Sequence, residues 1–253
     1  ISISALCLAA CKTDSDKPDM VPPVQIQPPV SGGDEPQDKE DEKRDTVLIS
    51  TVNSLNVRTG KGSSYASLGT IDKGDGLAKL SEIEDGWYRT VYKEKTAYVS
   101  ASYVTEMQFD MADEATERVI SEGKKLLGHP YVWGSQRYHW GNGVLNTNFK
   151  AGQFDCSALM QYIFYKGAGV LLDLNTRTQV LQGSVVDVSQ LKRGDLMFFT
   201  NSSRVNKTGI ERVGHVALYL GNNYILHTAS DYAVIERISD ARWNYYIQSN
   251  RAL

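Results

Sequence analysis

Several residue types and patterns are scarce in this chain of 253 residues, and each scarcity excludes a class of protein. Three cysteines are too few for a small scaffold held together by several disulfides. Four histidines, with no CxxC, HExxH or HxxxH spacing, argue against a zinc site. No run of 18 apolar residues is present, so no segment is expected to cross a bilayer as a helix.

Positive charge is not in excess either, because 27 Lys and Arg stand against 30 Asp and Glu, for a net charge of -3. A chain with this balance is not expected to bind nucleic acid, whose phosphates attract a basic surface. Hydrophobic residues make up 41% and charged residues 23%, as in a globular protein rather than a disordered one. The length favours about two domains.

Proline is almost confined to residues 12–45, which hold six of the seven prolines together with ten acidic and five basic residues. Proline and like charge both keep a chain extended. Two interpretations stay open. The segment is either a tether that reaches on the order of 100 Å at ~3.1 Å per residue, or a disordered tail with no spacing role.

The first eleven residues, ISISALCLAAC, are apolar and small, as at the end of an export signal. The run LAAC that ends at Cys11 resembles a lipoprotein box, in which the cysteine receives a lipid and becomes the mature N-terminus. We therefore expect a signal segment over 1–11 and a protein held to the membrane by a lipid on Cys11. The alternative is a buried apolar segment with an ordinary cysteine.

Residues 46–106 alternate short β-rich runs with turns. The runs VLIS (47–50), LNVRT (55–59) and WYRTVY (87–92) predict strands, whereas GKGSS, DKGDG and EDG are turn compositions. Five short strands in about sixty residues favour a small closed barrel. The segment resembles the bacterial SH3-like domain, a module without catalytic machinery that binds cell-wall peptides or shapes a neighbouring active site. Trp87 is either a binding residue or part of the barrel core.

Two helices are predicted early in residues 111–253. The first covers about 113–127, and the second begins at Cys156 and continues with apolar residues at helical spacing. Amide dipoles at a helix start favour an anion, so this position is expected to lower the pKa of the Cys156 thiol. A free thiol in an exported protein suggests a nucleophile, whereas the commoner fate of a free cysteine is a small buried hydrophobe.

The runs 214–221 and 223–229 predict a β-hairpin that carries His215 and His227. A three-residue loop, 221–223, pairs Leu220 with Tyr224 and puts both histidines on one face as diagonal neighbours, ~7–8 Å apart at the backbone. A two-residue loop, 222–223, puts them on opposite faces. Only the first register suits a cysteine nucleophile, a histidine base and a second polar residue that orients the base.

Six motifs occur in order along residues 111–253: HPYVWG (129–134), FDCSALMQYIF (154–164), NTRTQ (175–179), LKRGDLMFF (191–199), GHVALYLG (214–221) and YILHTAS (224–230). As a set they resemble the NlpC/p60 family of cell-wall cysteine peptidases. The resemblance implies an α+β fold, with a papain-like NlpC-type catalytic domain preceded here by a small all-β SH3-like barrel. It also implies hydrolysis of the bond between γ-D-glutamyl and a diamino acid in peptidoglycan stem peptides, with no metal and no cofactor.

Carried over residue by residue, the resemblance makes Cys156 the nucleophile, His215 the general base and His227 the residue that orients the base. The backbone N–H of Cys156 is the natural donor to the oxyanion. His129 and His139 are not expected to take part in catalysis.

The resemblance also implies substrate contacts. It places Tyr131 near the oxyanion, and Asp155 and Ser157 at the free amine or backbone of the substrate. Arg177 is either substrate-facing or part of a buried ion pair. The chain departs from the family in Ala158, where glycine is frequent, and in two long segments, 135–153 and 200–213, which are either walls of the groove or tolerated surface loops.

The sequence thus predicts a monomeric endopeptidase that acts on peptidoglycan stem peptides by a Cys-His-His mechanism at the extracytoplasmic face of the membrane. A requirement for a free L-alanine N-terminus stays open, because the barrel contributes to the cleft in family members with that requirement. The alternatives are an N-acetylmuramoyl-L-alanine amidase, an acyl transferase with the same cysteine and histidine, and a non-catalytic wall-binding lipoprotein.

Overall fold

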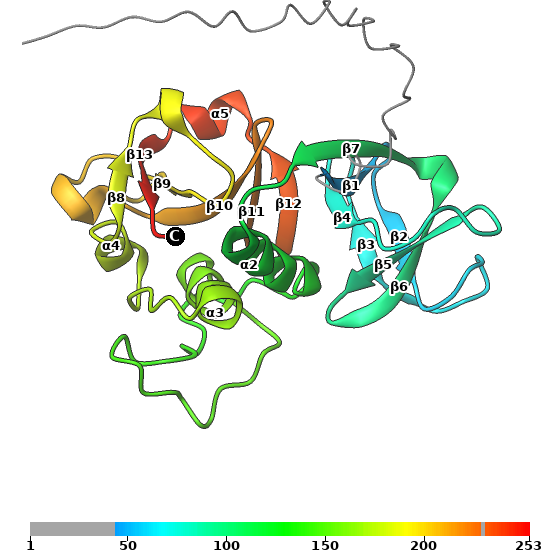
Figure 1. The fold of residues 1–253 in the computed structure, drawn as a ribbon, viewed down its shortest axis with the longest axis horizontal. Helices are drawn as coiled ribbons and strands as arrows, with labels where there is room; N and C mark the ends of the chain where they lie inside the picture. Colours follow the sequence, from blue (N-terminus) through cyan, green and yellow to red (C-terminus); the bar gives the residue numbers. More distant parts are fainter. Residues whose placement is uncertain (1–43, 229–230) are drawn as a thin grey trace, which may run out of the picture. The chain divides into compact units, whose positions relative to one another are not determined.

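The computed structural model describes residues 44–228 and 231–253, which lie in one compact unit (Figure 1). The signal expected over 1–11, with Cys11, lies outside the described residues, as does the tether as far as residue 43. Arg44 and Asp45, which the sequence assigned to the tether, instead open the first strand. No helix in the described part of the chain is long and apolar enough to cross a membrane.

Seven strands make up the N-terminal part, two more than the sequence predicted. They are β1 (Arg44–Ser50), β2 (Leu55–Arg58), β3 (Ser67–Ile71), β4 (Gly76–Ala78), β5 (Trp87–Tyr92), β6 (Lys95–Ser100) and β7 (Val104–Asp110). Four of them form a sheet in the order β3-β2-β6-β5, and β1 lies between β7 and β4 in a second sheet. The expected small all-β SH3-like module is confirmed. Trp87 is half-buried, whereas Val57, Ala97 and Val99 fill the core.

The C-terminal part is α+β, as expected. Its helices are α2 (Glu114–Lys125), α3 (Cys156–Ala168), α4 (Thr176–Gln179) and α5 (Asp240–Trp243), and its strands are β8 (Ser184–Val186), β9 (Leu196–Phe199), β10 (His215–Gly221), β11 (Tyr224–Thr228), β12 (Ala233–Arg237) and β13 (Tyr246–Arg251). These strands continue the second sheet, whose full order is β7-β1-β4-β12-β11-β10-β9-β13-β8. The link between the two parts of this sheet is the single pair Ile235–Gly76.

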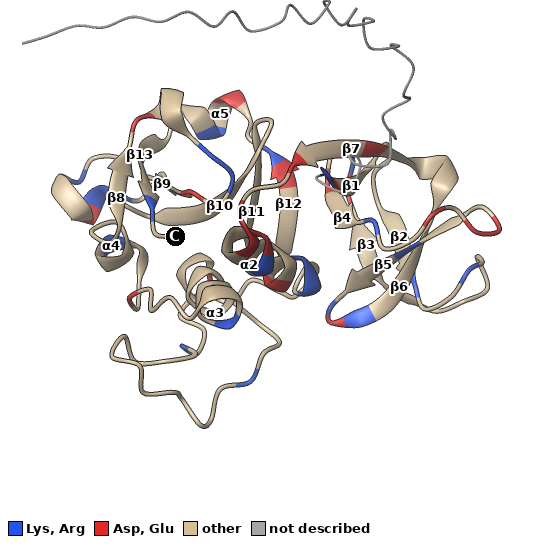
Figure 2. Ribbon diagram, viewed as in Figure 1, with Lys and Arg blue, Asp and Glu red and all other residues tan. Residues whose placement is uncertain are grey.

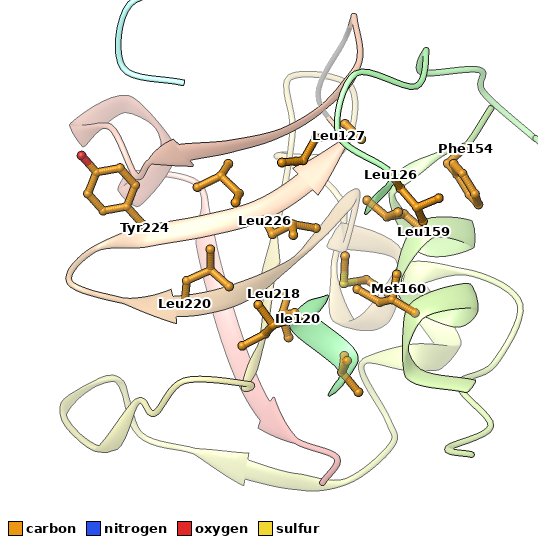
Figure 3. Packing of buried hydrophobic residues seen from close by; sticks show 14 of the residues in the cluster. Ile120, Leu126, Leu127, Phe154, Leu159, Met160, Leu218, Leu220, Tyr224 and Leu226 are labelled. Atoms are coloured by element: carbon orange, nitrogen blue, oxygen red, sulfur yellow. The ribbon is translucent and has the colours of Figure 1, made fainter. Parts of the chain in front are cut away.

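Helices α2 and α3 pack on each other, and α3 packs against the β10–β11 hairpin. Figure 3 shows Leu159 and Met160 of α3 in the same core as Leu218 of β10 and Leu226 of β11. Every residue of α3 from Cys156 to Phe164 is buried, which explains why the apolar residues cover more than one stripe of this helix. Gly167 permits the close approach of α2, because a Cβ there would lie 2.5 Å from the Val119 Cα.

The β10–β11 hairpin has the shorter of the two loops that the sequence left open. Its turn has two residues, Asn222 and Asn223, both with positive φ, and Gly221 rather than Leu220 pairs with Tyr224. A shift of register between Tyr219 and Gly221 adds one residue to β10. A two-residue turn alone would put the two histidines on opposite faces of the hairpin. The added residue in β10 reverses the side-chain alternation beyond the bulge, so His215 and His227 lie on one face after all.

A network of buried charges fastens the start of β1 to the C-terminal part. The Arg193 guanidinium donates to Asp45 at 2.6 Å and to Glu117 at 2.7 Å, and the Lys124 ammonium pairs with the other oxygen of Asp45. Figure 2 shows acidic and basic positions following one another along α2, the helix that supplies Glu117 and Lys124. A second link is the Tyr232 hydroxyl, which donates to Asp75 at 2.8 Å.

Candidate active site

The Cys156 thiol lies at the first residue of α3, at the point where this helix meets β10. Asp155 caps the helix, and its carboxylate accepts from the Ala158 N–H at 2.8 Å. The backbone amides of Val216 and Ser157 face the Cys156 sulfur closely enough to favour its thiolate. Val216 directly follows His215, so the thiol lies beside the strand that carries the expected base.

A row of four side chains runs across β10, β11, β12 and α5. His215 Nε2 lies 2.8 Å from His227 Nδ1, and His227 Nε2 lies 2.9 Å from Glu236 Oε1. Arg242 donates to the same carboxylate oxygen at 2.9 Å. The structure thus brings the predicted base and its orienting residue into direct contact, and adds two residues that the sequence analysis missed.

Glu236 was detectable in principle, because the alternation of the hairpin continues through AVIER on β12. His227 pairs with Val234, so Glu236 lies two residues further along the same face, next to the His227 ring. Arg242 lies in a four-residue helix after β12, and no local sequence pattern indicated that it belongs to the site.

Burial decides the charge states of the Cys156 thiol and the His215 imidazole. Burial raises the pKa of the Cys156 thiol to about 12, and the Asp155 charge adds to this effect. Burial, followed by the neighbouring His227 and Arg242, holds the pKa of His215 well below its ordinary 6.5. The expectation that the helix start lowers the thiol pKa is therefore wrong for this site, because desolvation of the thiolate outweighs the helix dipole. The resting pair is a neutral thiol and a neutral imidazole.

Glu236 is the fixed charge of the row. Its burial opposes ionisation, but the contacts with His227 and Arg242 keep its pKa below the ordinary 4.5. Burial lowers the pKa of His227, although Glu236 favours the protonated ring. At neutral pH the row therefore contains a carboxylate, two neutral imidazoles and a guanidinium.

Tyr131 lies near the thiol, as the sequence predicted for a residue of the oxyanion region. It bridges to Phe154 in parallel, and its N–H donates to the Asp231 carbonyl at 2.9 Å. Burial raises the pKa of its phenol, and the charges of Cys156 and Asp155 contribute.

Asp155 and Ser157, which are expected to contact the substrate, each have partners within the protein as well. Both are buried, and the Ser157 hydroxyl donates to Asp155 at 2.9 Å. Arg137 donates to the Asp155 carboxylate at 2.9 Å and to the Ser157 hydroxyl at 3.2 Å. Their contacts hold the first turn of α3, and Arg137, from the long segment 135–153, is a positioning residue that the sequence analysis missed.

The remaining candidates lie apart from the row of histidines. Arg177 forms a pair with Glu211 at 3.3 Å, and both side chains are partly exposed, so this is a surface contact rather than a buried ion pair. His139 is buried and its Nδ1 accepts from the Gly141 N–H at 3.0 Å. His129 packs against Phe154 and lies 3.3 Å from Glu94.

A hollow of about 540 Å³ opens beside His215, and Tyr131 and Arg242 also line it. Within residues 44–228 and 231–253, no group of three or more His, Cys, Asp or Glu is placed to hold a metal ion. Cys156 forms no disulfide and is the single cysteine of that part of the chain. The site therefore supplies a thiol, an imidazole held in one orientation by His227, and a hollow beside that imidazole.

Two family descriptions match this chain. Residues 128–252 match the NlpC/P60 family, and residues 53–105 match the bacterial SH3 domain. The first match contains Cys156 and the four residues of the row, His215, His227, Glu236 and Arg242.

Curated relatives match over part of their length. The chain is 32% identical over 173 residues to the gamma-DL-glutamyl hydrolase of Bacillus subtilis, which is 67% of this chain and 37% of that protein. It is 36% identical over 114 residues to the peptidoglycan endopeptidase RipA of Mycolicibacterium smegmatis, which is 45% of this chain and 21% of that protein. The chain thus spans between about a fifth and two fifths of the length of these two relatives.

Among solved structures, an NlpC/P60 family protein from Bacillus cereus is similar to this chain with a TM-score of 0.44 and 24% identity. The similarity covers 86% of this chain and 66% of that one.

Proposed function

The chain belongs to the NlpC/P60 family through residues 128–252, and from that membership we propose that it is a peptidoglycan endopeptidase. The proposed bond lies between γ-D-glutamyl and the diamino acid of a stem peptide. The observation that carries the proposal is the contact of His215 with His227 beside Cys156, since a thiol, a base and an orienting residue are the parts that acyl transfer from an amide requires.

The ionised Glu236 carboxylate determines which ring nitrogens of His227 and His215 carry a proton. An ionised carboxylate only accepts, so His227 donates from Nε2 and keeps a lone pair on Nδ1. His215 then donates from Nε2 to His227, which leaves His215 Nδ1 unprotonated and able to act as a base. These two hydrogen bonds therefore fix one tautomer in each of the two imidazole rings.

In the proposed reaction His215 takes the thiol proton as the Cys156 sulfur attacks the γ-glutamyl carbonyl. The imidazolium then gives that proton to the leaving amine, the C–N bond breaks, and a thioester remains on Cys156. Water attacks the thioester with His215 again as base, which releases the γ-carboxylate and restores the thiol. Because both groups start neutral, proton transfer accompanies attack rather than preceding it.

The oxyanion in this mechanism lies at the start of α3. The Cys156 N–H belongs to the first turn, whose amides have no partner within the helix. The Tyr131 phenol, near the thiol, is the proposed second donor.

The SH3-like part is proposed to border the substrate cleft. Asp75 of this part accepts from the Tyr232 hydroxyl, and Tyr232 closely follows β11, which carries His227. This contact supports a cleft that admits only substrates with a free L-alanine N-terminus, and Asp155 and Ser157 are proposed to lie at that free amine or at the backbone of the substrate.

The proposed location is the extracytoplasmic face of the membrane, with a lipid on Cys11 and residues 12–43 as a tether. Support comes from the lipobox-like LAAC sequence and from the cell-wall substrate. Metabolic labelling with an alkynyl fatty acid tests this directly. Cys11→Ser removes the label and releases the protein from membranes, whereas Cys7→Ser changes neither. Light scattering on the purified chain tests the proposed monomer.

The decisive experiment is mass spectrometry of stem peptides incubated with the protein and with Cys156→Ala. L-Ala-γ-D-Glu-diamino acid peptides are supplied both free and attached to glycan. Cleavage after D-Glu that is absent with the variant supports the proposal, and the preferred form shows whether a free N-terminus is required. A new N-terminus on L-alanine instead establishes the amidase, and transfer without hydrolysis the acyl transferase. Binding to wall fragments without cleavage leaves the wall-binding lipoprotein.

A further inference from the structure

Two buried hydroxyl groups beside the candidate active site lack a hydrogen-bond partner among the described residues. Thr200 follows β9 and Thr228 ends β11, and their side chains are 4% and 0% exposed. Neither Oγ1 has a hydrogen-bond partner in the described part of the chain. Leaving a buried hydroxyl unpaired costs about 1–3 kcal/mol, so two such groups in one place indicate a partner from outside.

Both hydroxyl-bearing residues line the hollow of about 540 Å³ beside His215. Phe199 and Tyr245 contribute aromatic walls. A concave site with apolar walls and a few convergent polar groups is the usual form of a site for a small ligand.

Arg242 supplies positive charge at this hollow. Its side chain is 26% exposed, and its one side-chain hydrogen bond within the described residues joins Nη2 to Glu236. A guanidinium has five N–H donors, so most of them remain for a ligand. Planar guanidinium donors suit a carboxylate, which accepts two of them at once.

The position of the hollow indicates which half of a substrate it takes. His215 lines it and Cys156 does not. In amide cleavage by a thiol, the histidine hands its proton to the leaving amine, so the leaving residue lies on the histidine side of the nucleophile. The hollow therefore faces the part of the substrate that departs.

We propose that this hollow is the leaving-group subsite and that it selects a diamino acid whose side chain carries a second carboxylate, such as diaminopimelate, over one that ends in an amine alone, such as lysine. The proposal rests on the proposed endopeptidase function and adds the identity of the released residue. Arg242 binds the second carboxylate, and the Thr200 and Thr228 hydroxyls bind the polar groups of the same residue.

The test compares two tripeptides, L-Ala-γ-D-Glu-meso-diaminopimelate and L-Ala-γ-D-Glu-L-lysine, as substrates of the full chain. We expect kcat/KM to favour the first by at least about tenfold, the size of one charge-assisted hydrogen bond. Arg242→Gln brings the ratio to within about twofold of one. Thr200→Val and Thr228→Val raise KM for the diaminopimelate peptide. The matched control, Thr90→Val, removes a buried hydroxyl in β5 of the SH3-like part and leaves both values unchanged.

Arg242 also touches Glu236, so its substitution lowers turnover of both peptides, and the ratio is the informative quantity. Equal rates with the two peptides, or an unchanged ratio in Arg242→Gln, overturn the subsite. Calorimetric binding of both peptides to Cys156→Ala separates this result from failure of the proposed function. If Cys156→Ala binds the diaminopimelate peptide more tightly but the unmodified chain cleaves neither peptide, the subsite is retained and the proposed endopeptidase function is rejected. Equal binding rejects the subsite whether or not either peptide is cleaved.

Discussion

His215 Nε2 lies 2.8 Å from His227 Nδ1 across the β10–β11 hairpin, and this contact determines which nitrogen of His215 is free to act as a base. Because His227 donates its other N–H to the Glu236 carboxylate, His215 is the donor in the contact between the two rings. In the proposed mechanism, the chemistry at Cys156 therefore depends on a carboxylate two hydrogen bonds away.

The first prediction concerns this carboxylate. Glu236→Gln keeps the size of the side chain but lets its amide donate to His227 Nε2, which reverses the tautomers of both rings. We expect kcat to fall by about 100-fold or more, with little change in KM and in thermal stability. Glu211→Gln is the matched control, since Glu211 is an exposed carboxylate that pairs with Arg177 and Arg204. Normal kcat in Glu236→Gln would remove the carboxylate from the mechanism.

The second prediction concerns the nucleophile and base. Cys156→Ala and His215→Ala are each expected to lower hydrolysis of a stem peptide by at least about 1000-fold. The double variant is expected to be no worse than either single one, because the two groups act as a unit. His139→Ala, at a buried histidine outside the row, is expected to retain the chemistry in the folded fraction. Additive losses in the double variant would contradict the pairing of thiol and imidazole.

The third prediction is a pH dependence. Burial raises the pKa of the Cys156 thiol to about 12, so iodoacetamide is expected to modify Cys156 slowly at pH 7 and about tenfold faster per pH unit above it. Burial lowers the pKa of His215, so kcat/KM is expected to decline on the acid side only well below pH 6.5. Together these limits give a broad bell-shaped profile that belongs to the coupled pair. A plateau of alkylation that extends below pH 6, the mark of a preformed thiolate–imidazolium pair, would contradict a neutral resting state.

The fourth prediction concerns stability at the N-terminal edge. Asp45 contacts both Lys124 and Arg193, so Asp45→Asn is expected to lower the free energy of unfolding by about 3 kcal/mol. Burial opposes ionisation of Asp45, but these two cations hold its pKa below the ordinary 3.8. The stabilisation is therefore complete above pH 3.8 and is lost as the pH falls below that value.

Denaturant unfolding measures this change in the free energy of unfolding. The control is Glu114→Gln, because Glu114 forms an exposed ion pair with Arg118. This substitution is expected to change the free energy of unfolding by under about 1 kcal/mol. A chain that starts at Thr46 should behave like Asp45→Asn. Full stability of that shortened chain would show that the network contributes nothing.

The fifth prediction is that a chelator leaves the activity unchanged. The proposed mechanism uses a thiol, two imidazoles and a carboxylate, none of which requires a metal. Hydrolysis is measured before and after dialysis against EDTA, with a zinc peptidase as the sensitive control. Loss of activity that a metal salt restores would contradict a metal-free reaction.

Local patterns in the sequence were sufficient to predict an SH3-like module, a helix that begins at Cys156 and a hairpin that carries two histidines. The residues around Cys156 predicted a helix start there, and Asp155 caps that helix in the structure. Alternation around His215 and His227 predicted the hairpin, because a strand with one buried face repeats every two residues. The SH3-like segment was detectable from its strands and turns, although two of its strands were not.

Tertiary structure decided what depends on contacts between distant segments. A bulge in β10 brought the two histidines to one face with a two-residue turn, and periodicity alone does not reveal an added residue. Glu236 and Arg242 complete the row from a later strand and helix. Asp155 and Ser157 face Arg137 because the segment 135–153 returns to the start of α3. The thiol pKa rises rather than falls because burial by the surrounding fold, which no local pattern encodes, outweighs the helix dipole.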